Sequence, residues 1–447
     1  MKPATLSPYP QSQQILQHNR KFIPGGVVSV NRATQPELTF VRAEGASMWD
    51  ADGNRYIDYH AAFAPYFLGH NDPDVTDAVL QAIDSKTSLF GSGTTVLEGE
   101  LAEAFCDCVP TADSVQLMNT GSEATAQAIR LARAATGRDH IIVVQGSYNG
   151  WHNDVSCNVM TPLSVLGERR SPGEYPYLSM SAGVPVAHQQ LIHIVNFNDL
   201  DSVRYVCERY SIAAMITEPI LQNIGIVKPQ PAYLEGLREL ADTYGFVLIF
   251  DEVKTGFRHA PGGYAQISGV TPDLATYGKA IANGYPMAAV AGKSELMNLF
   301  VDKDNTRRVL LAGTYNAHPV ATAAAIATIR KLGREHGEVY RHVDRLGEQM
   351  ERGLQAIIRD IGITAVVARQ GSAFCIYFMD HLPVDWHDVA ANHRFDRDSE
   401  LRQKLIERGI YFFPAAAKQC SISYAHTEED IRMTLECVRE SLREMAS

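Results

Sequence analysis

The stretch that decides the fold is Phe246–Lys279, with the sequence FVLIFDEVKTGFRHAPGGYAQISGVTPDLATYGK. It begins with five apolar residues, 246–250, which are too few for a typical helix and too uniformly apolar for a half-exposed strand. Such a run predicts a strand buried on both faces of a parallel sheet. Ligands bind outside the carboxyl ends of the strands in these sheets, so we expect Asp251 at the rim of a binding site.

A lysine follows the same stretch. Lys279 comes after a loop and a second short apolar run, 274–277, which predicts another strand. Two strand ends can therefore present a carboxylate and an amine to one ligand. This pair suits pyridoxal 5′-phosphate (PLP) chemistry, in which a lysine holds the cofactor and a carboxylate keeps the pyridine nitrogen protonated.

Two other interpretations of this stretch stay open at this point. An apolar strand followed by Asp-Glu is also typical of a nucleotide-binding site, and Gly292–Ser294 resembles the end of a phosphate-binding loop. That loop requires a glycine at position 287, where the chain has Met287. The second alternative is that Asp251 simply ends a buried strand and has a structural role.

Composition limits the class of protein. The chain has 447 residues, 45% of them hydrophobic and 20% charged, as expected for a globular enzyme of two or three domains. Its formal charge of −11 argues against nucleic acid or an anionic membrane as a partner. Of seven scattered cysteines only Cys106 and Cys108 are close, so we expect no metal site and a reduced environment. No signal peptide or membrane span is evident, which predicts a soluble, cytoplasmic protein.

Three regions are expected along the chain. Residues 1–65 form an arm and a hairpin of two strands, 40–59, around the turn at 50–53. Residues 66–320 form a large α/β domain, because strands and helices alternate there. We expect strands at 114–118, 140–144, 192–195, 212–216 and 246–250, and helices at 73–84, 97–108, 123–136, 199–209 and 231–244.

Residues 325–447 show a different pattern and predict a smaller α+β domain, completed by the N-terminal hairpin. We expect long amphipathic helices over 325–360, strands within 363–379, a helix at 398–408, a strand at 410–413 and a closing helix at 427–445. Within the large domain, residues 160–190 form a long insertion rich in Pro, Gly and Ser. It is either a lid over the site or a surface excursion.

A candidate phosphate site follows the strand at 114–118. The sequence Asn119-Thr-Gly-Ser-Glu123 leads directly into a helix, where Gly121 permits close backbone approach. Free N–H groups and the helix dipole at such a start bind a dianion. The same residues are also typical of a plain helix cap. No GxGxxG motif is present, which argues against a dinucleotide.

Six ordered motifs, spread over a resemblance that covers about residues 20–445, together identify a family. They are NTGSEATAQAIRLARAATGRDHI, QGSYNGWH, TEPI, FDEVKTGFR, TPDLATYGKAIANGYP and GTYNAHPVATAAAIATI. They resemble the class III PLP-dependent aminotransferases of fold type I, and among these the group around glutamate-1-semialdehyde 2,1-aminomutase. The resemblance implies an α/β fold with a large, mainly parallel, seven-stranded sheet domain and a smaller α+β domain.

The resemblance also implies the roles of the catalytic pair and of the residues around the cofactor ring. Lys279 would hold PLP covalently and carry a proton between substrate and cofactor. Asp251 would pair with the pyridine nitrogen, whose positive charge it stabilises. Val253 would pack on one face of the ring and Tyr148 on the other.

Further cofactor contacts are carried over in the same way. Gly121 and Ser122 would hold the phosphate, and Asn223 falls where the aminomutase group has an asparagine near the 3′-oxygen of the cofactor. Glu218 would order the end of its strand. Thr314 resembles the residue that reaches the phosphate from the neighbouring subunit, which implies a homodimer with shared active sites.

Substrate recognition is expected at three residues. Ser29 and Arg32 fall where the aminomutase group binds a carboxylate, for which the planar guanidinium of arginine is suited. Lys418 falls where that group has a glutamate that faces the substrate, and we expect the lysine to bind an acidic group. Two further departures are Asn149, where the aminomutases have histidine, and the 160–190 insertion.

These departures favour a transaminase with ping-pong kinetics. It would move an amino group from an amino acid or amine to a keto acid, ketone or aldehyde. The alternatives are the aminomutase itself, another PLP reaction such as epimerisation, or a PLP-binding regulator. No helix-turn-helix module is evident in the sequence, which argues against the regulator.

Overall fold

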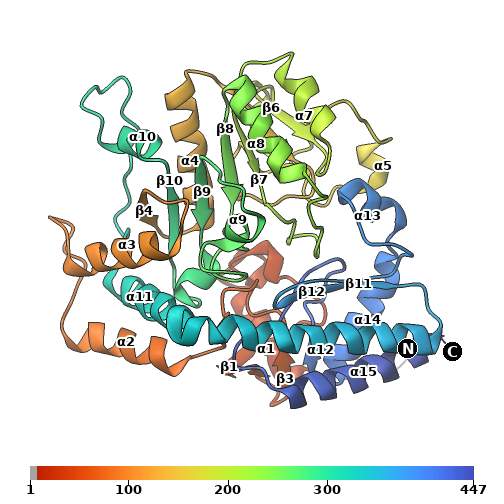
Figure 1. Ribbon diagram of the computed structural model, residues 1–447. Helices are drawn as coiled ribbons and strands as arrows, with labels where there is room; N and C mark the ends of the chain where they lie inside the picture. Colours follow the sequence, from red (N-terminus) through yellow and green to blue (C-terminus); the bar gives the residue numbers. More distant parts are fainter. Residues whose placement is uncertain (1–7, 447) are drawn as a thin grey trace.

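The computed structural model describes residues 8–446 and shows an α/β fold (Figure 1). A seven-stranded sheet has the order β4-β10-β9-β8-β7-β5-β6. β10 is antiparallel to β4 and β9, while β9, β8, β7, β5 and β6 are parallel. The strands are β4 (Ser114–Met118), β5 (His140–Val144), β6 (Ile192–Val195), β7 (Ile212–Thr217), β8 (Val247–Asp251), β9 (Leu274–Tyr277) and β10 (Ala288–Gly292).

Helices cover this sheet, as the layered arrangement in Figure 1 shows. All residues of β7 and β8 are buried, which confirms that the apolar run before Asp251 is a two-faced inner strand. The helices of this part are α2 (Pro73–Asp84), α3 (Val96–Cys108), α4 (Gly121–Thr136), α5 (Leu163–Leu166), α6 (Val186–Gln189), α7 (Leu200–Cys207), α8 (Tyr233–Tyr244), α9 (Gly263–Ser268), α10 (Ser294–Met297) and α11 (Pro319–Gly333).

Two smaller sheets and four helices complete the fold. β3 pairs in parallel with β13, so the N-terminal hairpin and the C-terminal segment share one sheet. The sheets contain β1 (Phe40–Glu44), β2 (Ser47–Asp50), β3 (Arg55–Asp58) and β13 (Ile410–Tyr411), and β11 (Val366–Gln370), β12 (Ala373–Tyr377) and β14 (Cys420–Ser421). The helices are α12 (Glu338–Ile361), α13 (Trp386–Asn392), α14 (Phe395–Glu407) and α15 (Glu428–Ala446). The domain boundaries at 65/66 and 320/325 stay a prediction.

Several details differ from the sequence-based expectation. The hairpin has a third strand, β1, and the strand expected at 410–413 covers only 410–411. The helical region 325–360 is two helices, α11 and α12, because a glycine-bounded turn at 333–337 interrupts it. β10 was not expected, since its sequence AAVAG has few residues that favour strands.

The N-terminal arm contains a helix, α1 (Pro10–Asn19), that packs on the chain's own hairpin turn. Asp52 in that turn accepts hydrogen bonds from the backbone N–H groups of Gln11 and Ser12, at 2.7 and 3.0 Å, and from the Ser12 hydroxyl. The first seven residues of the expected arm lie outside the described part. Over residues 8–446 no helix is both long and apolar enough to cross a bilayer.

Candidate active site

Five segments converge at one edge of the seven-stranded sheet. Asp251 is the last residue of β8 and pairs with Thr276 of β9, two residues before Gly278 and Lys279. β7 pairs in parallel with β8 and ends before Glu218. β5 pairs in parallel with β7 and ends a few residues before Tyr148. Helix α4 begins just after β4. The sheet topology thus brings these residues together, as expected for an open parallel sheet.

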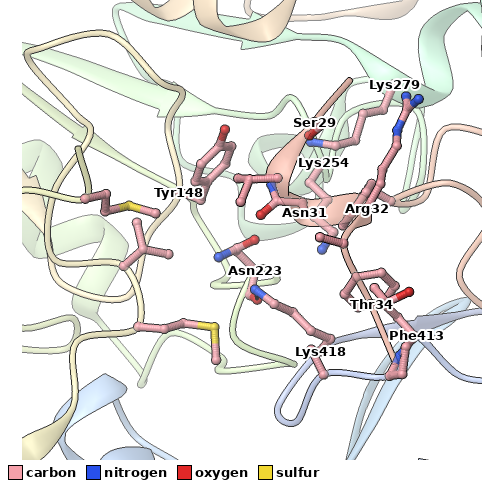
Figure 2. A pocket seen from close by; sticks show the side chains of 18 of the residues that line it. Ser29, Asn31, Arg32, Thr34, Tyr148, Asn223, Lys254, Lys279, Phe413 and Lys418 are labelled. Carbon is pink, nitrogen blue, oxygen red and sulfur yellow. Dashed lines mark hydrogen bonds between the residues drawn. The ribbon is translucent and has the colours of Figure 1, made fainter. Parts of the chain in front are cut away.

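A cavity of about 600 Å³ opens at this edge (Figure 2). Nine of the twelve residues expected at the site line it, namely Ser29, Arg32, Tyr148, Glu218, Asn223, Asp251, Val253, Lys279 and Lys418. Gly121 and Ser122 lie behind this lining, in contact with Val253 and Gly150. Thr314 is exposed on a turn before α11 and does not line this chain's cavity.

Asp251 is buried and held by three donors. The side-chain amide of Asn149 donates to it at 2.8 Å, the Val253 backbone N–H at 3.0 Å and the Thr276 hydroxyl at 3.1 Å. Burial raises the pKa of Asp251 above its ordinary value, while these donors and the Lys279 amine oppose the rise. A buried carboxylate of this kind is stabilised in its charged form by an adjacent cation, such as a protonated ring nitrogen.

Lys279 begins a short 3₁₀ helix with a backbone φ of +47°, a conformation that is uncommon for residues other than glycine. Such backbone strain is concentrated at functional sites. Burial lowers the pKa of Lys279, and Asp251 and Glu218 partly offset this. A lowered pKa increases the fraction of neutral, nucleophilic amine.

The start of α4 is closely packed against the cavity. A Cβ atom at Gly121 would come within 2.8 Å of Val253 Cγ1, and one at Gly150 within 2.8 Å of Ser122 Oγ. The helix is capped by Thr120 and Glu123, so the expected cap is present. This leaves the first N–H groups of the helix, those of Gly121 and Ser122, outside the cap and available to an anion.

Glu218 orders the loops after β5 and β7. Its carboxylate accepts hydrogen bonds from the backbone N–H groups of Tyr148 at 2.9 Å and Gln222 at 2.8 Å. Burial raises the pKa of Glu218, whereas these donors and the ammonium of Lys254 oppose the rise. Tyr148 and Asn223, both in the cavity wall, therefore depend on one carboxylate for their position.

The insertion at 160–190 forms part of the cavity wall. Met160 and Met180 line the cavity. The segment is anchored on both sides, because Tyr175 N–H donates to Ile194 O of β6 at 2.8 Å and the Trp386 ring N–H donates to Thr161 O at 2.9 Å. Parts of the insertion therefore belong to the cavity wall, while much of the rest is exposed on the surface.

Two residues of the site were not assigned roles from sequence. Asn149, where the chain departs from the aminomutase pattern, donates a hydrogen bond from its side-chain amide to Asp251 at 2.8 Å. Lys254 follows Asp251 by three residues and lines the cavity. Its position in the same strand-end loop was the available signal, but the direction of its side chain depends on the fold.

The nucleotide-binding interpretation is excluded by position. β10 runs antiparallel to β9, so Lys293 lies beyond its far end, at the sheet edge opposite Asp251. There the Lys293 ammonium pairs with Asp273 at 2.5 Å. Glu252, the residue after Asp251, is buried and accepts hydrogen bonds from the backbone N–H groups of Tyr264 and Ala265.

The residues of this site fit PLP. A buried carboxylate and a half-buried, strained lysine face one cavity, and a glycine-bearing helix start lies behind the valine on its wall. Together with the seven-stranded sheet, they define a PLP-dependent enzyme of fold type I.

Comparison with known proteins identifies the family. The family model described as aminotransferase class-III matches residues 28–442. A glutamate-1-semialdehyde 2,1-aminomutase from Desulfatibacillum aliphaticivorans is 36% identical over 97% of this chain and 100% of its own. An omega-transaminase from Sphaerobacter thermophilus has a TM-score of 0.90 with 28% identity, covering 100% of this chain and 99% of that one. A transaminase with PLP bound has a TM-score of 0.85 with 27% identity, covering 98% of each chain.

The chain belongs to the class III aminotransferase family. It is a PLP-dependent enzyme that transfers an amino group, either between two molecules or within one.

Proposed function

We propose that the protein is a transaminase that moves an amino group between an amino acid or amine and a keto acid, ketone or aldehyde in a ping-pong reaction. The observation that carries the proposal is the position of Lys418. Its side chain lines the cavity and donates to Asn223 O at 3.0 Å. This lysine in the cavity lining supports the proposal, because the resemblance implies a glutamate at this position.

The charge of Lys418 bears directly on the choice of reaction. An aminomutase must accommodate a substrate skeleton with two amino groups, and an additional ammonium repels them. Two like charges at about 4 Å interact by roughly 4 kcal/mol at an effective dielectric constant near 20. The same ammonium attracts a carboxylate, which favours an acidic donor or acceptor.

The chain's residues have the following proposed roles. PLP, when bound, supplies a ring that withdraws electrons from the substrate. Lys279 holds the cofactor and moves the proton at the substrate carbon, and Asp251 keeps the proton on the ring nitrogen. Val253 and Tyr148 enclose the ring, and Met160 and Met180 exclude water from the cavity.

Four residues have proposed roles at the two ends of the cavity. Gly121 and Ser122 bind the phosphate through the helix start. Ser29 precedes, and Arg32 ends, a 3₁₀ segment (Val30–Arg32) in the cavity lining, and both bind a substrate carboxylate.

The second candidate function is glutamate-1-semialdehyde 2,1-aminomutase. It is favoured by the name of the 36% identical relative, which matches this chain over nearly its whole length. An intramolecular exchange returns the nitrogen to the same carbon skeleton and releases no deaminated product, whereas a transaminase releases the deaminated keto product of its donor after the first half-reaction.

The test is a screen of half-reactions. The purified, PLP-loaded protein is mixed with single amino donors, and loss of the visible absorbance of the lysine-bound cofactor is followed together with release of the keto product. We expect stoichiometric keto product from at least one donor. Efficient isomerisation of glutamate-1-semialdehyde, with no keto product from any donor, would overturn the transaminase proposal.

A Lys279→Ala variant is the control for the screen. We expect it to stay folded but to lose both the visible band and all product, because Lys279 is the amine proposed to hold the cofactor and to move the proton. Retention of the band would assign the cofactor to another lysine, Lys254 being the nearest in sequence to Asp251.

A further inference from the structure

The cavity carries an excess of positive charge. Its lining contains four basic side chains, Arg32, Lys254, Lys279 and Lys418 (Figure 2). Among the described residues that line the cavity, only Asp251 and Glu218 are carboxylic acids. PLP chemistry engages Lys279 and Asp251 with the cofactor. Glu218 alone then faces the other three cations.

Lys254 and Lys418 are held by one short segment. Lys254 Nζ donates to the backbone oxygen of Gln222 at 2.8 Å, and Lys418 Nζ donates to the backbone oxygen of Asn223 at 3.0 Å. The two lysines come from different parts of the chain, the loop after β8 and the loop before β14. Adjacent carbonyl groups therefore fix both ammonium groups at one side of the cavity.

Each ammonium retains donors for a ligand. A lysine ammonium has three N–H donors, and each of these lysines uses one on a backbone oxygen. Neither forms an ion pair within 4 Å of a carboxylate in residues 8–446. Buried cations without a close anionic partner are costly to maintain, and an acidic ligand removes that cost.

We infer that Lys254 and Lys418 form a second anion-binding subsite, so that the substrate carries a further acidic group besides the carboxylate bound by Ser29 and Arg32. The substrate class is an amino dicarboxylic acid or the corresponding keto diacid. This inference rests on the proposed function, because it extends the substrate of the same site. Two anionic groups match the two positive charges left in excess.

Electrostatics agrees with the geometry. Burial and, after it, the positive charge of Lys279 lower the pKa of Lys254 well below its ordinary value, and the charge of Lys418 lowers it further. The positive charge of each lysine thus disfavours protonation of the other. An anion bound by both would offset this repulsion.

The test measures binding of unreactive acids to the PLP-loaded enzyme, by calorimetry or by the shift of the cofactor absorbance. Glutarate is compared with its monoamide, glutaramate, which has the same length and shape but one charge fewer. We expect glutarate to bind about 10-fold to 100-fold more tightly, as for hydrogen bonds to charged groups. Equal affinity of the unmodified enzyme for both acids would refute the subsite.

Variants assign the subsite to the two lysines. In Lys254→Met and in Lys418→Met the preference for glutarate over glutaramate should fall by about threefold to tenfold. The double variant should show no preference for glutarate. Lys254→Arg should retain part of it. The matched control is Lys293→Met, at the opposite edge of the sheet, which should keep the full preference. An unchanged preference in the double variant would place the second anion elsewhere and overturn the assignment.

The outcomes separate this inference from the proposed function. Circular dichroism and thermal melting show whether each variant is folded. If Lys254→Met is unfolded, the glutarate preference of Lys254→Arg and of Lys418→Met tests the assignment instead. A preference for diacids without any half-reaction would refute the transaminase proposal and leave the subsite. Half-reactions with monoacids alone, together with equal binding of glutarate and glutaramate, would refute the subsite and leave the transaminase proposal.

Discussion

Asn149 shows how one side chain can set the chemistry of a residue far away in the sequence. Its amide is 2.8 Å from the Asp251 carboxylate, 102 positions later in the chain. The donor favours the charged form of Asp251, the form that the proposed pairing with the ring nitrogen of the cofactor requires. Asn149 is therefore a positioning residue for Asp251.

We predict that Asn149→Ala weakens the catalytic pair. Loss of a hydrogen bond to a buried carboxylate costs about 1.5–3 kcal/mol and raises the pKa of Asp251 further. Turnover should fall and its acidic limb should move to higher pH, as measured by the pH profile of the half-reaction. Asn149→His, which restores an N–H donor, should recover most of the effect. A pH profile of Asn149→Ala identical to that of the unmodified enzyme would contradict this role.

The titration of Lys418 gives a second prediction at this scale. Burial lowers its pKa to about 8, with Glu218 opposing the shift and Arg402 adding to it. Lys254 and His60 also face this lysine, since its charge lowers the pKa of both. Only the protonated amine attracts an acid, so affinity for glutarate should decline above about pH 8, by about tenfold per pH unit at most.

The sign of the stability effect separates affinity from unfolding. The folded-state pKa of Lys418 lies below its ordinary value, so protonated Lys418 destabilises the fold below about pH 8 and this penalty disappears as the pH rises. Weaker binding at high pH is therefore not caused by unfolding at this lysine. Calorimetric titrations of the enzyme with glutarate from pH 7 to 9 test the predicted loss of affinity. The affinity of the Lys418→Met variant should depend less on pH.

At the scale of elements, the ends of the parallel strands carried most of the predictable information. The apolar run before Asp251 predicted a buried strand, and its topology placed Lys279, Glu218 and Tyr148 at the same edge. Patterning along one segment was enough for this, because parallel strands share the direction of their carboxyl ends.

Other parts of the site depended on contacts that no single segment encodes. Phe63 lies in a run of four residues with positive φ, Ala61–Ala64, which Asp58 supports through the backbone N–H of Ala61. It lines the cavity beside Phe413, with ring centroids 5.1 Å apart. Sequence patterns do not predict left-handed turns of Ala and Phe, since these are held by tertiary packing. Sequence patterns likewise do not predict that Met160 and Met180 form part of the cavity wall.

The start of α4 gives a prediction for this scale. Gly121→Ala would place a Cβ atom 2.8 Å from Val253 Cγ1, closer than normal contact. The valine must then shift into the cavity, at a cost of about 1–3 kcal/mol, and PLP affinity should fall about 5-fold to 100-fold. Equilibrium titration of the apoenzyme with PLP measures this.

Two variants control the Gly121 experiment. Gly121→Ala/Val253→Ala restores the space and should bind PLP more tightly than the product of the two single effects predicts. Gly99→Ala, where the new Cβ meets nothing within 4 Å, should leave PLP affinity unchanged. If the effects of Gly121→Ala and Val253→Ala on the free energy of PLP binding are strictly additive, the contact between these two residues does not couple the helix to the cavity wall.

At the scale of the whole molecule, the surface around Thr314 is apolar. Leu310 is 69% exposed, Tyr315 63% and Trp151 72%, and Asn316 of the same turn bonds Asn119 beside the start of α4 at 3.0 Å. Exposed apolar groups gathered at one face indicate a protein–protein interface. We propose that this face joins two copies of the chain and that Thr314 reaches the phosphate site of the partner.

The proposed homodimer predicts complementation between two defective subunits. Lys279→Ala removes the lysine from a subunit's own site, and Thr314→Ala removes a phosphate contact, worth roughly 1.5–3 kcal/mol, from its partner's site. In a hybrid of the two variants, one site has both defects and the other has neither. At limiting PLP, random exchange of equal amounts should therefore restore about a quarter of the unmodified activity. If Thr314 instead served its own subunit, no site in the hybrid would be intact and the mixture would stay at the average of its parents. Thr306→Ala, another exposed threonine in the preceding loop, should bind PLP normally and show that the loss in Thr314→Ala is specific to that position.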